Sequence, residues 1–191
     1  MFVSLGSNCS VSYQLAKYNI KPIALPFDWC QININQLISV FENNFENFSN
    51  FEILKESTKH NLIENNKIIG ETSLVLKNSY NILFSHEILS KYSLDKFTIK
   101  MNERIKRFIE LKEKLIFVRI ELSPIKNNYI NKIQKLLDLL DKYFINYELI
   151  LIVPNILKLD NAKITCYTYG TFSSDWKMDH LPWNSYLKFI K

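Results

Sequence analysis

The hydrophobic residues of this chain follow two patterns that alternate along its length. Short continuous apolar runs are typical of strands buried on both faces of a sheet; they are residues 2–5, 115–120, 149–153 and 164–169. Apolar residues that recur every three or four positions predict amphipathic helices; they mark residues 9–19, 37–48, 94–108 and 130–140. Helices alternating with such strands predict a mostly parallel sheet with helices on both faces, which is a three-layer α/β/α sandwich.

The remaining segments are harder to assign. Residues 74–76 and 80–84 predict two short strands around a turn, whereas residues 49–73 are polar and show no clear period. Pro22 and Pro26 favour an extended path between the first two helices. No repeat or linker divides the 191 residues, so we expect a single α/β domain over residues 1–191.

Composition and charge argue against several classes of protein. The chain has 47% hydrophobic and 23% charged residues, which is typical of a globular protein. Its net charge of +5 is spread along the chain without a run of five like charges, so no nucleic-acid partner is expected. No secretory signal is visible at the start, and the longest apolar run, residues 149–154, is too short to span a membrane.

The three cysteines and three glycines narrow the chemistry further. Cys9, Cys30 and Cys166 are widely spaced without a CxxC pair, which favours free thiols in a reducing compartment and therefore a cytoplasmic location. The chain has no GxGxxG motif and no P-loop, and no His/Cys/Asp cluster has the spacing of metal ligands. We therefore expect no cofactor and no metal.

Cys9 is the principal candidate for chemistry. The first apolar run, the Gly6-Ser7-Asn8 turn and the following helix put Cys9 in the first turn of that helix. Unpaired N–H groups there favour an anion, so we expect a lowered pKa and a nucleophilic thiolate. Asn8 and the backbone N–H of Ser10 are a candidate oxyanion hole. The alternatives are that Cys9 is a small buried hydrophobe and that Asn8 caps the helix.

Two histidines are candidate bases. His86 follows a predicted strand and precedes Glu87, and a His oriented by a carboxylate is the usual partner of a nucleophilic Cys. Glu87 is alternatively a substrate-binding residue. His180 follows Asp179 near the end of the sequence and either serves the site or caps a turn, whereas His60 lies in polar sequence and is expected to be solvated.

Asp28 is a charged residue in apolar surroundings. It lies between Phe27 and Trp29, where burying a charge without a partner is costly. It either orients a catalytic His or forms a structural salt bridge, for which Arg104 and Arg107 are candidate partners.

Arg119 is the odd residue within an apolar strand, and a buried Arg normally faces an anion. That anion is Asp28, Glu121 or a carboxylate or phosphate of a substrate. Open α/β sheets bind ligands beyond the carboxyl ends of their strands. If the first strand is central, we expect Cys9, His86, Arg119 and Asp28 to line one pocket there.

The beginning of the chain resembles a known family. Residues 4–15 (SLGSNCSVSYQL) and 25–29 (LPFDW) are similar to the opening of a domain of unknown function named as papain-like cysteine peptidases, found in bacteria and some large DNA viruses. Residues 84–87, 102–108 and 117–119 are similar as well, so the resemblance spans most of the chain. It implies a Cys nucleophile, carried by Cys9, and a His base, carried by His86.

The same turn is also similar to the Gly-Ser-Cys-Phe-Ala group, a relative of the SGNH (GDSL-type) hydrolases. That group has a flavodoxin-like three-layer fold, a nucleophilic Ser in the first strand–helix turn and a C-terminal Asp-x-x-His pair. The resemblance implies a flavodoxin- or SGNH-like sheet with Ser7 as nucleophile and His180 as base. The chain departs from the pattern because Asp179 directly precedes His180.

Three functions are compatible with these residues. The leading hypothesis is a thiol-dependent hydrolase or acyl transferase that uses Cys9. The second is an SGNH-like esterase or O-acyl transferase acting on surface polysaccharide. The third is a carbohydrate- or anion-binding module without catalysis, in which Cys9 is packing. The expected partner is a small-molecule, peptide or glycan substrate, and the sequence carries no signal of oligomeric state.

Overall fold

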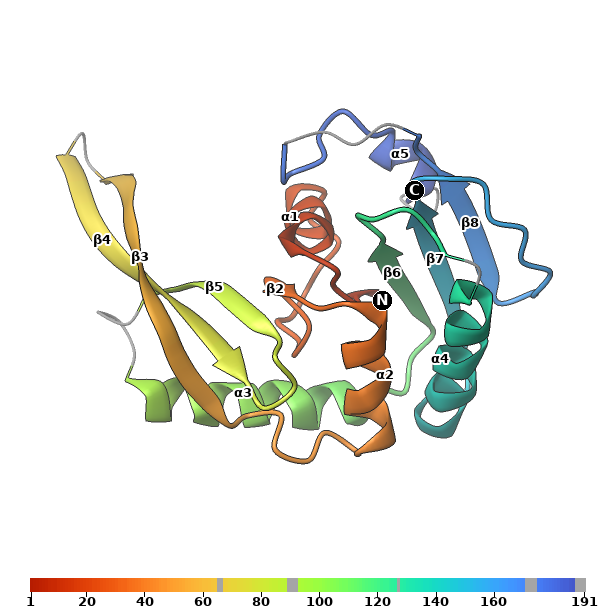
Figure 1. Cartoon of the computed structure of the whole chain (residues 1–191), viewed down its shortest axis with the longest axis horizontal. Helices are drawn as coiled ribbons and strands as arrows, with labels where there is room; N and C mark the ends of the chain where they lie inside the picture. Colours follow the sequence, from red (N-terminus) through yellow and green to blue (C-terminus); the bar gives the residue numbers. More distant parts are fainter. Residues whose placement is uncertain (65–66, 89–92, 127, 171–174, 188–191) are drawn as a thin grey trace.

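The strands form two four-stranded sheets, one parallel and one antiparallel (Figure 1). The structure is a computed structural model that describes residues 1–64, 67–88, 93–126, 128–170 and 175–187, without the side chains of residues 55–64, 67–74 and 86–88. The strands are β1 (Phe2–Ser4), β2 (Cys30–Gln31), β3 (Phe51–Glu64), β4 (Lys67–Asn78), β5 (Leu83–Ile88), β6 (Leu115–Ile120), β7 (Tyr147–Val153) and β8 (Ile164–Thr168). The helices are α1 (Cys9–Lys17), α2 (Ile34–Glu42), α3 (Leu94–Ile109), α4 (Tyr129–Tyr143) and α5 (Trp183–Tyr186).

The parallel sheet has the strand order β1-β6-β7-β8. Successive residues of β6 point to opposite faces. Leu115 and Phe117 pack in one cluster with side chains of α2, α3 and α4, whereas Ile116 and Val118 pack in a second cluster with side chains of α1 and α5. Because helices cover both faces, every residue of β6 is buried, which explains why all of them except Arg119 are apolar.

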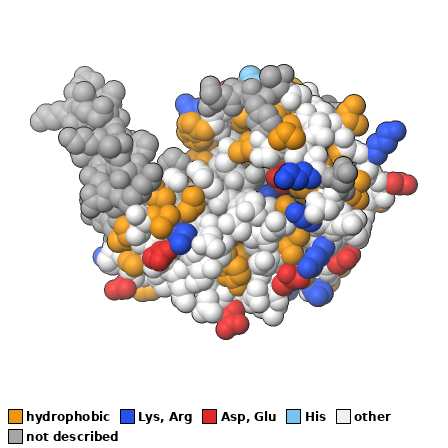
Figure 2. Space-filling view, viewed as in Figure 1, with side chains coloured by type: hydrophobic (Ala, Val, Ile, Leu, Met, Phe, Trp, Pro, Cys, Tyr) orange, Lys and Arg blue, Asp and Glu red, His pale blue; other side chains and the backbone are white. Residues whose placement is uncertain are grey.

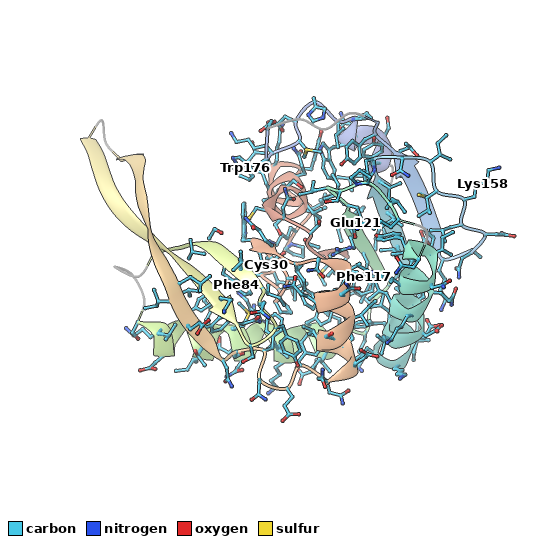
Figure 3. The ribbon with its side chains drawn as sticks, viewed as in Figure 1. Cys30, Phe84, Phe117, Glu121, Lys158 and Trp176 are labelled. Carbon is cyan, nitrogen blue, oxygen red and sulfur yellow. The ribbon has the colours of Figure 1, made fainter. Side chains whose placement is uncertain are left out.

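The antiparallel sheet has the order β2-β5-β4-β3, and a chain of aromatic rings joins it to the parallel sheet. Phe84 of β5 contacts Phe48, Phe48 contacts Phe27, Phe27 contacts Phe108, and Phe108 contacts Phe117 of β6, with ring centroids 5.5 to 6.4 Å apart. Figure 3 shows Phe84 and Phe117 at the two ends of this chain. Contacts between aromatic rings contribute stabilising free energy beyond that of burying each ring, so they hold the two sheets together.

The α/β class is confirmed, but two expectations about the sheets are wrong. A mostly parallel sheet was expected, but half of the described strands lie in an antiparallel sheet. Residues 49–73 contain β3 and most of β4, which form a long hairpin whose sequence has no alternating apolar pattern to reveal it. β1 is at an edge of the parallel sheet and pairs with β6 alone in the described sheets. The three-layer sandwich and its likeness to flavodoxin or SGNH folds stay predictions.

Two local expectations also need correction. The second helix is predicted as far as residue 48 but ends at Glu42, because Asn44 and Phe45 adopt left-handed backbone with φ of 49° and 62°. The path after Pro22 is not extended throughout, because a turn over residues 26–29 ends with Trp29 at φ 61°. In the described part of the chain, no helix is both long enough and apolar enough to cross a membrane.

Candidate functional site

A tight turn joins β1 to α1 and contains two residues with left-handed backbone. Gly6 has a φ of 72° and Ser7 a φ of 82°. A Cβ on Gly6 would lie 2.3 Å from Cγ2 of Ile32, so a side chain does not fit there. Ile32 also donates its backbone N–H to the carbonyl oxygen of Ser7 at 3.1 Å. A positive φ is costly for a residue other than glycine, so Ser7 is a strained residue held in place by its surroundings.

Cys9 is the first residue of α1, and Asn8 caps that helix. Oδ1 of Asn8 accepts hydrogen bonds from the backbone N–H of Ser10, at 3.0 Å, and from the Ser10 hydroxyl. The Ser10 N–H is therefore engaged by the cap rather than open to an oxyanion. Cys9 is only 5% exposed, and burial raises the pKa of its thiol to about 11. The expected lowering of this pKa is wrong, because burial removes the hydration that would stabilise the thiolate.

Asp28 is buried and holds the loop before β2 against α1. Its Oδ2 accepts the backbone N–H of Leu25 at 2.7 Å and pairs with Nζ of Lys21 at 2.8 Å. Its Oδ1 accepts the Ser12 hydroxyl at 3.1 Å, and that hydroxyl accepts the backbone N–H of Trp29 at 3.2 Å. The contacts are those of a structural salt bridge, with Lys21 rather than an arginine of α3 as the cation.

Arg119 is fully buried near the end of β6 and is paired with Glu121. Its Nε donates to Oε1 of Glu121, and its Nη1 and Nη2 donate to the carbonyl oxygens of Leu5 at 2.9 Å and Ile32 at 3.2 Å. The Tyr129 hydroxyl donates to the same Oε1 at 2.7 Å. Burial, and next the charge of Glu121, raise the pKa of Tyr129, so the phenol remains a donor. Of the two protein carboxylates predicted as partners of Arg119, Glu121 is in contact with it and Asp28 pairs with Lys21 instead.

A pocket of about 290 Å³ lies where β1 and β6 end. Its lining residues are Ser7, Gln31, Ile32, Asn33, Gln36, Asn81, Leu83, Glu121, Leu122 and Ser123. Figure 3 shows Glu121 just beyond β6. The chain passes from β1 to α1 on one face of the sheet and from β6 to α4 on the other. Neighbouring parallel strands with such diverging connections leave a crevice at their carboxyl ends, which is where open α/β sheets bind ligands.

The pocket contains some of the predicted site residues and not others. Ser7 lines it, and Arg119 lies behind it in contact with Glu121. Cys9 follows Ser7 by two residues but, like Arg119 and Asp28, is absent from the residues that line this pocket. Arg119 instead holds the backbone of Leu5 and of the lining residue Ile32, and Asp28 holds the loop before β2.

His86 and Glu87 lie in β5, and their side chains are outside the described residues. The backbone of β5 nevertheless passes close to the β1–α1 turn. Phe84, two residues before His86, pairs with Cys30, whose sulfur would be 3.7 Å from a Cβ on Gly6. Figure 3 shows Cys30 and Phe84 near each other, where β2 and β5 pair. The roles of His86 and Glu87 stay predictions.

His180 is exposed and lies beside the second half of α1. The carboxylate of the neighbouring Asp179 accepts a hydrogen bond from Gln14 and pairs with Lys17, each at 2.7 Å. Cys9 is at the opposite end of that helix. The role of His180 as a base therefore stays a prediction, and no contact among the described residues supports it. The side chain of His60, in β3, is outside the described residues.

The three cysteines are free, and burial raises the pKa of each thiol. Cys30 is fully buried and its Sγ lies 3.3 Å from the carbonyl oxygen of Phe27, which is a packing position, and Cys166 is half-buried in β8. Among the described residues, no group of three or more His, Cys, Asp or Glu side chains is placed to hold a metal ion.

Sequence reasoning missed most of the pocket. Asn33, Gln36 and Asn81 line it from α2 and from the turn before β5, and isolated amides in polar segments give no signal in one sequence. Glu121 did have a signal, because it is an acidic residue directly after a buried strand, at the edge of the sheet where ligands bind.

Comparison with known proteins agrees with the resemblance seen at the start of the chain. A sequence model of the family described as "Putative papain-like cysteine peptidase" matches residues 1–153, and the chain belongs to this family. The chain is also 33% identical over 156 residues to an uncharacterized protein of Acanthamoeba polyphaga mimivirus, a match that covers 73% of this chain and 70% of the viral protein. The family match includes all the predicted site residues except His180.

Proposed function

We propose that the chain is a cysteine-type hydrolase or acyl transferase in which Cys9 attacks an acyl carbon near the carboxyl end of β1. The observation that carries this proposal is the position of Cys9, first in α1 and directly after the strained turn that borders the pocket. Membership of a family described as cysteine peptidases supports a thiol nucleophile. The three free cysteines support a reducing, cytoplasmic setting for it.

A base is essential to this proposal. Because the pKa of Cys9 is raised to about 11, its thiol is protonated at neutral pH and must lose the proton as it attacks. We assign the base to His86, which is supported by the course of β5 past Cys30 and the Gly6 turn. Glu87 is the candidate to orient the ring or to contact the substrate.

The reaction has two halves. Sγ of Cys9 bonds to the acyl carbon while its proton passes to His86. The oxyanion is stabilised by backbone N–H groups at the start of α1 other than that of Ser10, and by the side-chain NH₂ of Asn8, whose Oδ1 is occupied by the cap. The proton then passes from His86 to the leaving group as that bond breaks, which leaves a thioester on Cys9. Water or an acceptor hydroxyl attacks the thioester, its proton passes through His86 to the departing sulfur, and the thiol is restored.

Hydrolysis of p-nitrophenyl acetate tests the proposal. We expect the wild-type protein to release p-nitrophenol with an acetylated Cys9 peptide detectable by mass spectrometry, and Cys9→Ala to lose this activity. His86→Ala should lower the rate by about 10²–10⁴-fold, the usual contribution of a general base. Cys166→Ala, which removes a half-buried thiol in β8, is the matched control and should be fully active. A Cys9→Ala protein with the wild-type rate would refute the proposal.

One observation favours a second candidate, in which Ser7 is the nucleophile of an SGNH-like esterase or O-acyl transferase. Ser7 lines the pocket and has a φ of 82°, and nucleophilic serines of α/β-hydrolases also sit on strained strand-to-helix turns. Helices on both faces of the parallel sheet support a flavodoxin- or SGNH-like fold. In this version His180 is the base. A fluorophosphonate probe that labels Ser7 in the Cys9→Ala protein would favour it, and a protein that the probe leaves unlabelled would exclude it.

A further inference from the structure

We propose that the pocket between β1 and β6 binds an uncharged, hydroxyl-rich group the size of one sugar unit, with Glu121 as its central hydrogen-bond acceptor. The catalytic consequence, that this group belongs to the acyl substrate or to the acceptor, rests on the proposed function. The binding itself does not.

Glu121 determines the charge and polarity of the ligand. It is only 9% exposed, and Arg119 and Tyr129 both bond to its Oε1. No described residue donates a hydrogen bond to Oε2. The buried guanidinium of Arg119 already balances the carboxylate, so an ammonium group would bring an uncompensated charge. An anion would be repelled by the carboxylate, which only accepts hydrogen bonds. Oε2 of Glu121 is therefore suited to accept a hydrogen bond from an uncharged donor of the ligand.

The other polar groups of the pocket suit a ligand that both donates and accepts. Ser7 and Ser123 contribute hydroxyls, and Gln31, Asn33 and Asn81 contribute amides. Hydroxyl groups of a ligand match such a set, because each of them is a donor and an acceptor. Among the described residues that line the pocket, Glu121 alone carries a formal charge. On the face seen in Figure 2, the described cationic and anionic side chains are interspersed, so no patch of one sign would draw a charged ligand.

The side chain of Gln36 links two of the segments that line the pocket. Its Oε1 accepts the backbone N–H of Asn33 at 2.8 Å, and its Nε2 donates to the carbonyl oxygen of Asn81 at 2.8 Å. The start of α2 and the turn before β5 are thereby fixed relative to each other, and their amides are arranged before a ligand arrives.

The size and the apolar part of the lining limit the ligand further. A volume of about 290 Å³ is at the lower end for ligand pockets, which fits one ring rather than an extended chain. Ile32, Leu83 and Leu122 supply apolar surface for the C–H groups of such a ring. An apolar peptide side chain would use the apolar part alone and leave the amides and Glu121 without partners, which is unfavourable.

Calorimetric titration of Cys9→Ala protein tests the inference without turnover. The probes are glucose, galactose and N-acetylglucosamine, with an acetylated, amidated alanine tripeptide and inorganic phosphate as the competing classes. We expect saturable binding of at least one sugar and none of the tripeptide or phosphate. Saturable binding of the tripeptide or phosphate without any sugar, or of no probe at all, would overturn the inference.

Two variants link the binding to this pocket. Asn81→Gly removes a lining amide without backbone strain, because Asn81 has a φ of 58°, and should weaken sugar binding at least threefold. Asn19→Gly is the matched control, with a φ of 55° and a position outside the pocket, and should leave binding unchanged. Glu121→Gln should weaken binding about tenfold or more, because the charged acceptor is lost. Sugar binding that survives both pocket variants would contradict the assignment.

The outcomes separate the two proposals. Sugar binding in a protein that never reacts with esters would refute the catalytic proposal and keep this one. Ester hydrolysis that depends on Cys9 in a protein that binds no sugar would do the opposite.

Discussion

Replacement of Arg119 by methionine should destabilise the protein more than a surface substitution does. The guanidinium is fully buried and donates to Glu121 and to the carbonyl oxygens of Leu5 and Ile32. Methionine has a similar reach but no charge and no donor. The Glu121 carboxylate would then stay largely buried with Tyr129 as its remaining described partner. Breaking a buried ion pair from one side costs about 3–5 kcal/mol. For a chain of this size, that corresponds to a fall in Tm of roughly 6–20 °C.

Urea denaturation followed by circular dichroism measures this effect. Arg107→Met is the matched control, because Arg107 is exposed and its one described hydrogen bond goes to Glu103 of its own helix; we expect a change within about 0.5 kcal/mol. The double variant Arg119→Met, Glu121→Leu should recover part of the loss, because no unpaired charge remains. An Arg119→Met protein within about 1 kcal/mol of wild type would show that the pair is not needed. A double variant no more stable than the single one would show that the unpaired carboxylate is not the cause.

Three further predictions concern the backbone, a salt bridge and pH. Gly170→Ala should lower the free energy of unfolding by roughly 1–2 kcal/mol, because alanine is strained in the left-handed backbone of that position. Gly6→Ala should lower it clearly more, because its Cβ would also clash with Ile32. Equal melting temperatures of the two variants would contradict this. Asp28→Ala should lower the free energy of unfolding by about 3 kcal/mol in urea, because it leaves the largely covered Lys21 ammonium and buried donors without the carboxylate, and a loss under about 1 kcal/mol would argue against it. Burial raises the pKa of the Cys9 thiol from 9.0 to about 11, so between these pH values the folded chain keeps a proton that the unfolded chain has lost. The free energy of unfolding should therefore fall by about 1.4 kcal/mol per pH unit as the pH rises from 9 to 11. Cys9→Ser should remove this part of the pH dependence. Identical slopes would show that Cys9 is not the cause.

Elements that bury a regular face were predictable from the sequence. β6 occupies residues 115–120 as predicted, and α3 is within one residue of its predicted end, because the apolar period of each segment reports its own burial. The long hairpin of β3 and β4 was not predictable, because residues 49–73 show no apolar alternation and each strand takes its hydrogen bonds from its partner. Likewise, α2 stops at Glu42 through left-handed residues that have no strict sequence signature.

The features of the candidate site also divide into those that the sequence predicts and those that only the folded chain determines. The family, the junction that puts Cys9 first in a helix, and the need of Arg119 for an anion are local properties that a single sequence expresses. Four features required the folded chain: the edge position of β1, the choice of Glu121 over Asp28 as partner of Arg119, the pocket shared by Ser7 and Glu121, and the raised pKa of Cys9. Each of them depends on distances between residues far apart in sequence or on the water that packing excludes. A helix terminus acts on its neighbour in the chain, whereas desolvation is produced by everything that packs around the group.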